Sequence, residues 1–347
     1  MNINTLTDFL DQSQCQFIIY DLGRKVTKIS NSDFKKIEHN DCPYPYPIQQ
    51  HAFIAITFWQ INNHQQEHFI WFIKMPIDEQ GFMKIGAQTS FIKIIVDAMG
   101  NDLTANMSKN QQQSLANNPF IFKPNTEKLA IFNAAINTCF IRPASSFYPA
   151  AQSYFSGEQA WSDWQNLGIQ GIADLATRLN YDNNQQNIIA ALPYLPPQPM
   201  QSLALCLENQ EQISSELATA IAKQADIELQ KNNQDNAVLL LRALSSVSAS
   251  SISKALLEKQ FSSDLIYNTH WYISIAGRLW HLLEDETLLN RFFETLANHH
   301  PEIFSELFID LVAIPSLRDK VLKQLRLTAR SPALSQAIGM LFSNVKK

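Results

Sequence analysis

Apolar residues follow two different spacings along this chain, and the change between them divides it into two regions. In roughly the first third, segments rich in aromatic and β-branched residues alternate with segments whose apolar residues recur every three or four positions. The predicted strands are 16–20, 25–29, 52–59 and 68–74, and the predicted helices are 5–14, 31–37 and 89–99. The strands form two pairs with short polar connections, which is typical of antiparallel hairpins. This order of elements predicts an α+β N-terminal domain, an antiparallel sheet with flanking helices.

From about residue 156 to the end, only helical spacing is found, and short breaks interrupt it. Several segments carry apolar residues on more than one face, as expected for helices that pack between neighbours. Pairs of helices recur at roughly 30–45 residues, the spacing of HEAT-type repeats. We therefore expect an all-α helical-repeat-like (HEAT-like solenoid) C-terminal domain, with a compact irregular bundle as the alternative. The expected domains are an α+β domain at 1–125, a connector with one helix at 126–155 and an all-helical repeat-like domain at 156–347.

The charge of the chain bears on its partners. The formal net charge is −5, whereas nucleic-acid binding requires clustered Lys and Arg. Acidic residues stand just upstream of the most basic stretch, so we interpret that stretch as a solvated helix face. Nucleic-acid binding through it is kept as an alternative. The basic residues are Arg318, Lys320, Lys323, Arg326 and Arg330.

The apolar segments are short, and this bears on the compartment. The longest stretches, 52–59 and 69–75, fall well below the ~20 residues that a membrane-spanning helix needs. The N-terminus shows no basic-then-apolar signal sequence, and the four cysteines form no Cys-x-x-Cys pair. We expect a cytoplasmic protein with free cysteines and without a membrane partner.

One motif has the spacing of a metal site. His64, Glu67 and His68 match His-x-x-Glu-His, the inverted zinc-protease signature. That chemistry needs both histidines on one helical face, so that two imidazoles hold Zn²⁺ while the glutamate activates water. These residues precede and enter a predicted strand, where their side chains do not converge. They remain the candidate metal ligands, but we expect a hairpin connection without metal.

A second group of candidates consists of polar residues that border the predicted strands. An enzyme with a site between the two domains would draw on these side chains, although no nucleophile–base pair or Gly-rich phosphate loop accompanies them. The residues of this possible functional surface are Asp21, Arg24, His51, Asp78 and Glu79.

Three further motifs have a plain structural interpretation. Ser251 and Lys254 match Ser-x-x-Lys, but the companion motifs of serine acylases are absent. His281 precedes a run of acidic residues that would favour its charged form, and we interpret the run as an acidic helix surface. Trp161 and Trp164 share one face of a predicted helix, where we expect core packing; an exposed pair would instead anchor a partner.

Several strings in the first third resemble an uncharacterised gammaproteobacterial protein family, a domain of unknown function. They are Tyr20-Asp-Leu-Gly-Arg24, Pro47-Ile-Gln-Gln-His51-Ala52, Trp71-Phe-Ile-Lys-Met-Pro76-Ile-Asp-Glu-Gln-Gly81 and Asn118-Pro-Phe-Ile-Phe122. The resemblance implies a bacterial protein of this size and brings no activity, cofactor or site residue with it.

The sequence favours a non-enzymatic interaction or adaptor protein. A helical-repeat domain commonly presents an extended binding surface, and no convincing catalytic set is present. We therefore expect a protein partner, no cofactor and no catalytic residue. The alternatives are an enzyme with an unrecognised site between the two domains and a nucleic-acid-binding accessory factor.

Overall fold

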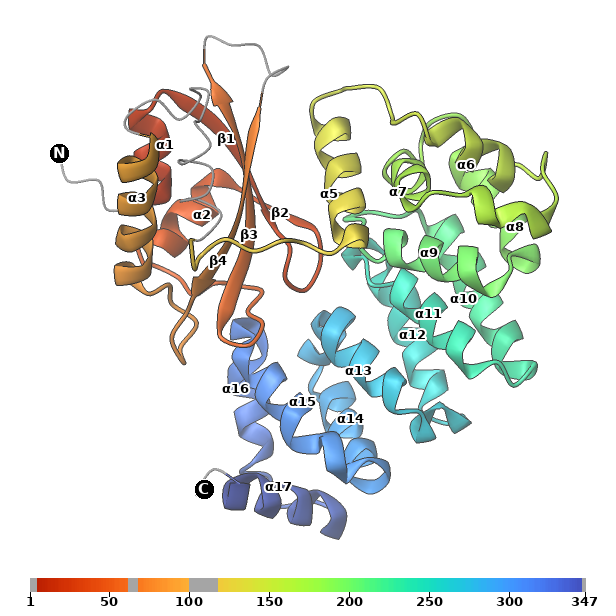
Figure 1. Ribbon diagram of the computed structural model, residues 1–347. Helices are drawn as coiled ribbons and strands as arrows, with labels where there is room; N and C mark the ends of the chain where they lie inside the picture. The colour runs from red at the N-terminus through yellow and green to blue at the C-terminus, as the bar shows by residue number, and fades with distance from the viewer. Residues whose placement is uncertain (1–4, 62–67, 100–117, 345–347) are drawn as a thin grey trace. The chain divides into compact units, whose positions relative to one another are not determined.

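The computed structural model describes residues 5–61, 68–99 and 118–344 (Figure 1). The chain divides into two compact units. The first comprises Met1–Asn125 with Ala313–Arg318, and the second comprises Thr126–Val312 with Asp319–Lys347.

A four-stranded antiparallel sheet forms the centre of the first unit. The strands are β1 (Cys15–Asp21), β2 (Thr27–Ile29), β3 (His51–Gln60) and β4 (Phe69–Pro76), in the order β2-β1-β3-β4. Both predicted hairpins are confirmed, because β1 pairs with β2 and β3 pairs with β4. The central pairing joins β1 to β3, with Ile19 opposite Ile56, and it holds the two hairpins in one sheet.

Three helices cover one face of this sheet (Figure 1). They are α1 (Leu6–Gln12), α2 (Asn31–Glu38) and α3 (Ile85–Met99), so α3 begins four residues before the predicted start at residue 89. Alternate strand residues such as Ile19, Ile54 and Ile73 point to this side and are fully buried. The period of two along each strand thus produces a single apolar core between sheet and helices.

The second unit is built from helices. Among the residues that the structure describes, none of the helices has both the length and the hydrophobicity needed to cross a bilayer. From Thr126 onward the α-helices are α5 (Thr126–Cys139), α6 (Tyr148–Phe155), α7 (Ile169–Thr177), α8 (Asn184–Ala191), α9 (Pro197–Leu207), α10 (Ser215–Gln230), α11 (Gln234–Ala243), α12 (Ser250–Gln260), α13 (Thr269–Arg278), α14 (Glu286–His299), α15 (Pro301–Ala313), α16 (Pro315–Gln324) and α17 (Pro332–Asn344). The 3₁₀ turns are Trp161–Asn166, Leu192–Tyr194, Val247–Ala249, Asp264–Tyr267 and Trp280–Glu284.

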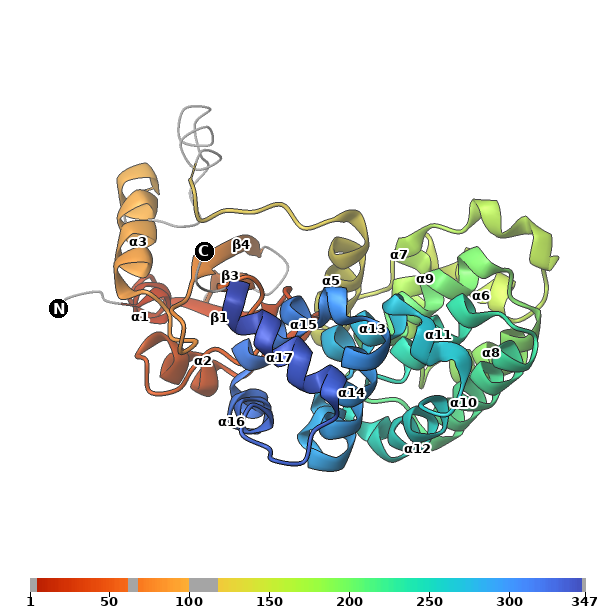
Figure 2. The same cartoon turned by 90° about the horizontal axis from the view of Figure 1, so that it is seen from below.

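Helices α5 to α13 follow one another in two rows (Figures 1 and 2). In one row α5 packs on α7, α7 on α9, α9 on α11 and α11 on α13. In the other row α6 packs on α8, α8 on α10 and α10 on α12. Helix α11 also touches α10 and α12, which explains why Val238, Leu240 and Leu241 are buried although they lie on different faces. An α+β unit followed by an all-helical repeat-like unit confirms the predicted fold class.

Two local predictions need correction. The segment 126–155 holds α5 and α6, where one helix was expected. Pro149 does not interrupt α6 because it lies in the first turn, where a missing amide donor costs nothing. The predicted helix that carries Trp161 and Trp164 is a 3₁₀ segment at Trp161–Asn166, and none of its residues is buried. Without an apolar face to bury, this segment gains little from extending into an α-helix.

Candidate functional site

The structure describes only one of the three candidate zinc ligands. His64 and Glu67 lie outside the described residues, and His68 is half-buried just before β4. Within residues 5–61, 68–99 and 118–344, no three His, Cys, Asp or Glu side chains are grouped closely enough to hold a metal ion.

The strand-border candidates lie at one end of the sheet. Asp21 ends β1, His51 begins β3, and Asp78 and Glu79 follow β4. The antiparallel register explains this placement, since Asp21 pairs with Ile54 while His51 pairs with Pro76. Proximity along the sheet end does not by itself assemble a catalytic set, because that requires side chains within hydrogen-bond reach of one another.

Two of these carboxylates fasten turns. The Oδ2 of Asp21 accepts a hydrogen bond from the backbone amide of Arg24 at 3.1 Å, and its Oδ1 accepts one from the Tyr44 hydroxyl at 2.5 Å. The Arg24 Nε donates to the carbonyl of Pro47 at 3.0 Å. Asp78 holds a separate turn, since its Oδ1 accepts from the amides of Gln80 and Phe82. These hydrogen bonds hold the Asp21 and Asp78 turns and join the first of them to the buried Tyr44.

The remaining two candidates are His51, which is half-buried, and Glu79. His51 Nδ1 lies 2.7 Å from the carbonyl oxygen of Gln49, and its ring is 6.2 Å from that of Phe53. Glu79 is exposed. The proposal that these five residues form a functional surface therefore rests on their shared sheet end alone.

Replacing Tyr44 with phenylalanine should lower the free energy of unfolding of the first unit by about 1–2 kcal/mol. Tyr44 is fully buried, and burial raises the pKa of its hydroxyl well above the ordinary value, so the group remains a donor to Asp21. The substitution removes that donor and leaves a buried carboxylate oxygen short of one hydrogen bond. Amide hydrogen exchange in β1 and β3 measures the change, and Tyr181→Phe, which removes a hydroxyl at an exposed position of the second unit, is the control. Equal protection in both variants would contradict the assignment.

The Ser-x-x-Lys match is not organised for acyl transfer. Lys254 Nζ forms an ion pair with Asp285 Oδ2 at 2.6 Å, and this hydrogen bond raises the pKa of the lysine. A general base needs the opposite shift. Asp285 also accepts from the amides of Thr287 and Leu288 at the start of α14, so it caps a helix as well as binding Lys254. Asp285, one of the acidic residues after His281, is therefore paired with Lys254 and with the start of α14.

A charge cluster around a buried carboxylate joins three successive helices of one row in the second unit. Glu208 directly follows α9 and is 2% exposed, while Arg242 and Arg278 lie in the last turns of α11 and α13. Glu208 Oε2 accepts from Arg242 Nε at 2.8 Å and pairs with its Nη2 at 2.8 Å. Glu208 Oε1 accepts from Arg278 Nε at 2.9 Å. One buried carboxylate therefore ties α9, α11 and α13 together, and we call these three residues the Glu208 cluster.

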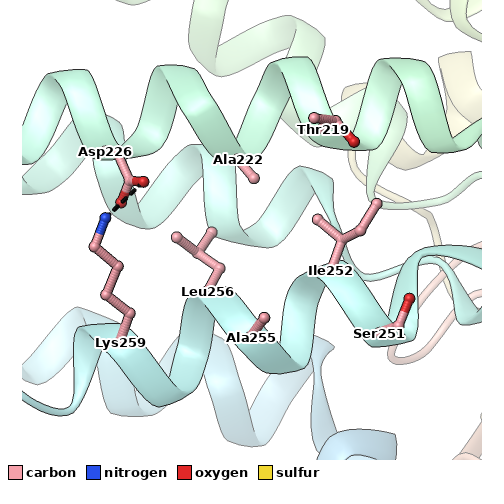
Figure 3. Close-up of a pocket in the computed structure, with 8 residues that line it drawn as sticks. All are labelled: Thr219, Ala222, Asp226, Ser251, Ile252, Ala255, Leu256 and Lys259. Atoms are coloured by element: carbon pink, nitrogen blue, oxygen red, sulfur yellow. Dashed lines mark ion pairs between the residues drawn. The ribbon is translucent and has the colours of Figure 1, made fainter.

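A groove opens to solvent between α10 and α12 of the other row (Figure 3). Its volume is about 400 Å³, and small side chains, Ala222 and Ala255, leave the space between the helices. The Asp226–Lys259 ion pair, 2.7 Å long, stands at one end. The other lining residues are Thr219, Ser251, Ile252 and Leu256.

The tryptophan pair is not part of the core. Trp161 stacks on Tyr194 with ring centroids 5.8 Å apart and meets the ring of Tyr154 edge-on at 5.4 Å. Both Trp161 and Trp164 are half-buried, because their segment is a short 3₁₀ turn on the surface. The expectation of core packing was wrong for this pair, although Trp161 is held by aromatic neighbours.

A comparison with protein-family models identifies the family of the chain. A family model described as a protein of unknown function, DUF3549, matches residues 1–342. The chain belongs to the DUF3549 family. The resemblance to an uncharacterised family is thereby confirmed, and it extends over both compact units. No curated protein and no solved structure matches this DUF3549 chain.

The Glu208 cluster and the groove were not singled out in the sequence. The three charged residues of the cluster are spaced 34 and 36 residues apart, as the hydrogen bond from Arg242 and the ion pair from Arg278 to Glu208 show. That spacing equals one helical repeat. Charged residues that recur at helix ends with this period are therefore the sequence pattern from which the cluster could have been predicted. The groove left no such signal, since alanines are common in any helix.

Proposed function

We propose that this DUF3549 protein is a non-enzymatic binding scaffold that holds an amphipathic helix of a partner protein in the groove between α10 and α12. The groove itself carries the proposal. It is an apolar furrow between two helices with polar groups at its margin, which matches the helix-in-groove mode of recognition.

The dimensions of the groove suit a short helix. The lining residues of α10 run from Thr219 to Asp226, about two turns or roughly 10 Å. A partner helix would place apolar side chains at positions i and i+3 or i+4 against Ile252 and Leu256, above the space left by Ala255. Burying two such side chains is the main source of affinity expected here.

One polar atom beside the groove, Asp226 Oδ1, indicates which polar residue the partner helix carries next to its apolar side chains. Asp226 Oδ2 is occupied by Lys259, whereas its Oδ1 is buried and accepts no hydrogen bond within the described part of the chain. A buried acceptor without a donor costs free energy, and a partner that supplies a donor recovers it if the Asp226 side chain turns toward the groove. The partner helix is therefore expected to carry Lys, Arg or Asn one turn from its apolar pair.

Filling the groove tests the proposal. Ala255→Glu keeps a good helix former at an exposed position but puts a charge and added volume into the groove, so partner affinity should fall at least about tenfold. Ala150→Glu, at an exposed alanine of α6, is the matched control and should bind as the native protein does.

The measurement first recovers a partner protein and then locates its binding site on this chain. A partner recovered from native lysate by the full chain is titrated against both variants, and amide hydrogen exchange locates its footprint. Protection confined to α10 and α12, lost in Ala255→Glu alone, is the expected result. A footprint elsewhere, or equal binding by both variants, would refute the groove as the binding site.

A further inference from the structure

The Glu208 cluster holds more positive charge than its buried carboxylate can neutralise. Two guanidinium groups contribute +2 and Glu208 contributes −1, so the hydrogen-bonded set carries +1. A single arginine is enough to pair one buried carboxylate, because its planar fork offers two parallel donors. The second arginine is therefore in excess of what the burial of Glu208 requires.

Both arginine side chains are partly exposed, and each has donors that Glu208 does not use. Each guanidinium has five N–H groups. Arg242 directs Nε and Nη2 at Glu208, and Arg278 directs Nε at Glu208 and Nη1 at the carbonyl of Gly277. Within the described residues, Arg242 Nη1 and Arg278 Nη2 have no hydrogen-bond partner, and the two side chains remain 24% and 25% exposed.

The cluster is also built to hold these donors still. Glu208 accepts hydrogen bonds from both guanidinium groups, and the Ser245 hydroxyl donates to the backbone carbonyl of Glu208 at 2.9 Å. Arg242 and Arg278 come from neighbouring helices α11 and α13, which pack on each other. Donors fixed in this way bind an anion with less loss of side-chain entropy than free surface arginines do.

From this geometry we propose that Arg242 and Arg278 form a binding site for a carboxylate, presented by an acidic peptide segment. One carboxylate brings the cluster to neutrality and offers two oxygens to the two unused donor edges. Glu208 acts as a positioning residue, because it orients both arginines without being available to the ligand itself. This site uses different helices from the α10–α12 groove and does not depend on the function proposed for that groove.

The test uses a blocked tetraglutamate peptide on the full-length protein at low ionic strength, where exposed charges are screened least. Arginine Nε–H resonances report binding at the two side chains directly. We expect tetraglutamate to shift the resonances of Arg242 and Arg278, and tetraglutamine to leave them unchanged.

Arg278→Gln should weaken the binding of tetraglutamate by roughly tenfold or more, the effect of losing one charge-assisted hydrogen bond. Arg242 still pairs with Glu208 in this variant, so the fold is retained, and far-UV circular dichroism checks it. Arg291→Gln on α14 removes the same charge elsewhere and is the matched control. Equal weakening by both variants, or binding of tetraglutamine, would show only a general charge effect and overturn the site.

Inorganic phosphate separates the two kinds of anion. Shifts with phosphate and none with tetraglutamate would overturn the carboxylate assignment. No shift with either anion would overturn the anion site altogether.

Discussion

Replacing Glu208 with alanine is expected to lower the free energy of unfolding of the second unit by about 3 kcal/mol. The carboxylate is 2% exposed and is the common acceptor for Arg242 and Arg278. Its removal leaves two guanidinium groups close together with no counter-charge. Both arginines are about a quarter exposed, so water recovers part of the loss, and the expected value stays at the lower end of the range for broken buried pairs.

Amide hydrogen exchange in α9, α11 and α13 measures this effect within the unit that contains the cluster. Glu211→Ala, three residues along the chain at an exposed position, is the matched control and should change the free energy by less than about 0.5 kcal/mol. A Glu208→Ala variant with native protection in these helices would mean that the cluster does not join them energetically.

Raising the pH from about 5 to about 8 is expected to destabilise the first unit by up to about 3 kcal/mol. Glu38 lies at the end of α2 and is 2% exposed. Its carboxylate accepts from the amides of Leu6 and Thr7 and from the Thr7 hydroxyl at 2.6 Å, so it closes the start of α1. Burial raises the pKa of Glu38 from 4.5 to about 7, although the hydrogen bonds from Thr7 and Leu6 act in the opposite direction.

The direction of the pH effect on stability follows from the ordinary and the raised pKa of Glu38. The folded unit binds the proton of Glu38 more tightly than the unfolded chain does, so the contribution is complete below about pH 4.5. It is lost as the pH rises through about 7, because the folded state must then hold a buried negative charge.

Glu38→Gln tests this explanation, since the amide resembles the protonated acid and does not titrate. The variant should show nearly constant protection of α1 and β1 between about pH 5 and pH 8, whereas the native protein loses protection. Exchange rates must first be corrected for their own pH dependence. Asp11→Asn removes an exposed carboxylate, half of the Asp11–Lys35 ion pair, and should leave the native profile unchanged. The same pH profile in Glu38→Gln as in the native chain would assign the effect to another group.

Much of the local structure could be predicted from residue patterns. The strand segments are aromatic and β-branched, and the turn with Asp21 and Gly23 joins β1 to β2 as expected. Errors arose where a pattern was short. The Trp161–Asn166 segment has helical spacing over six residues, which is too few to favour an α-helix without a buried face.

The candidate sites show a different limit. The strand-border residues were chosen for being polar, and the structure shows that Asp78 accepts from backbone amides, while Asp21 accepts from a backbone amide and from the buried Tyr44 hydroxyl. The Glu208 cluster was missed because its members are ordinary charged residues far apart in the chain. Only the stacking of one repeat on the next brings their side chains within hydrogen-bond distance.

The sequence by itself determined the two kinds of local order in this chain, a mixed first unit and a helical second one, because apolar periodicity is a property of neighbouring residues. Only the tertiary structure decided the β1–β3 pairing, the burial of Glu38 against α1 and the meeting of Arg242 and Arg278 on Glu208. These contacts join residues more than 25 positions apart, as the 31 positions between Thr7 and Glu38 illustrate. Their energies depend on desolvation and on the geometry of packed elements, and neither quantity is encoded in a local pattern.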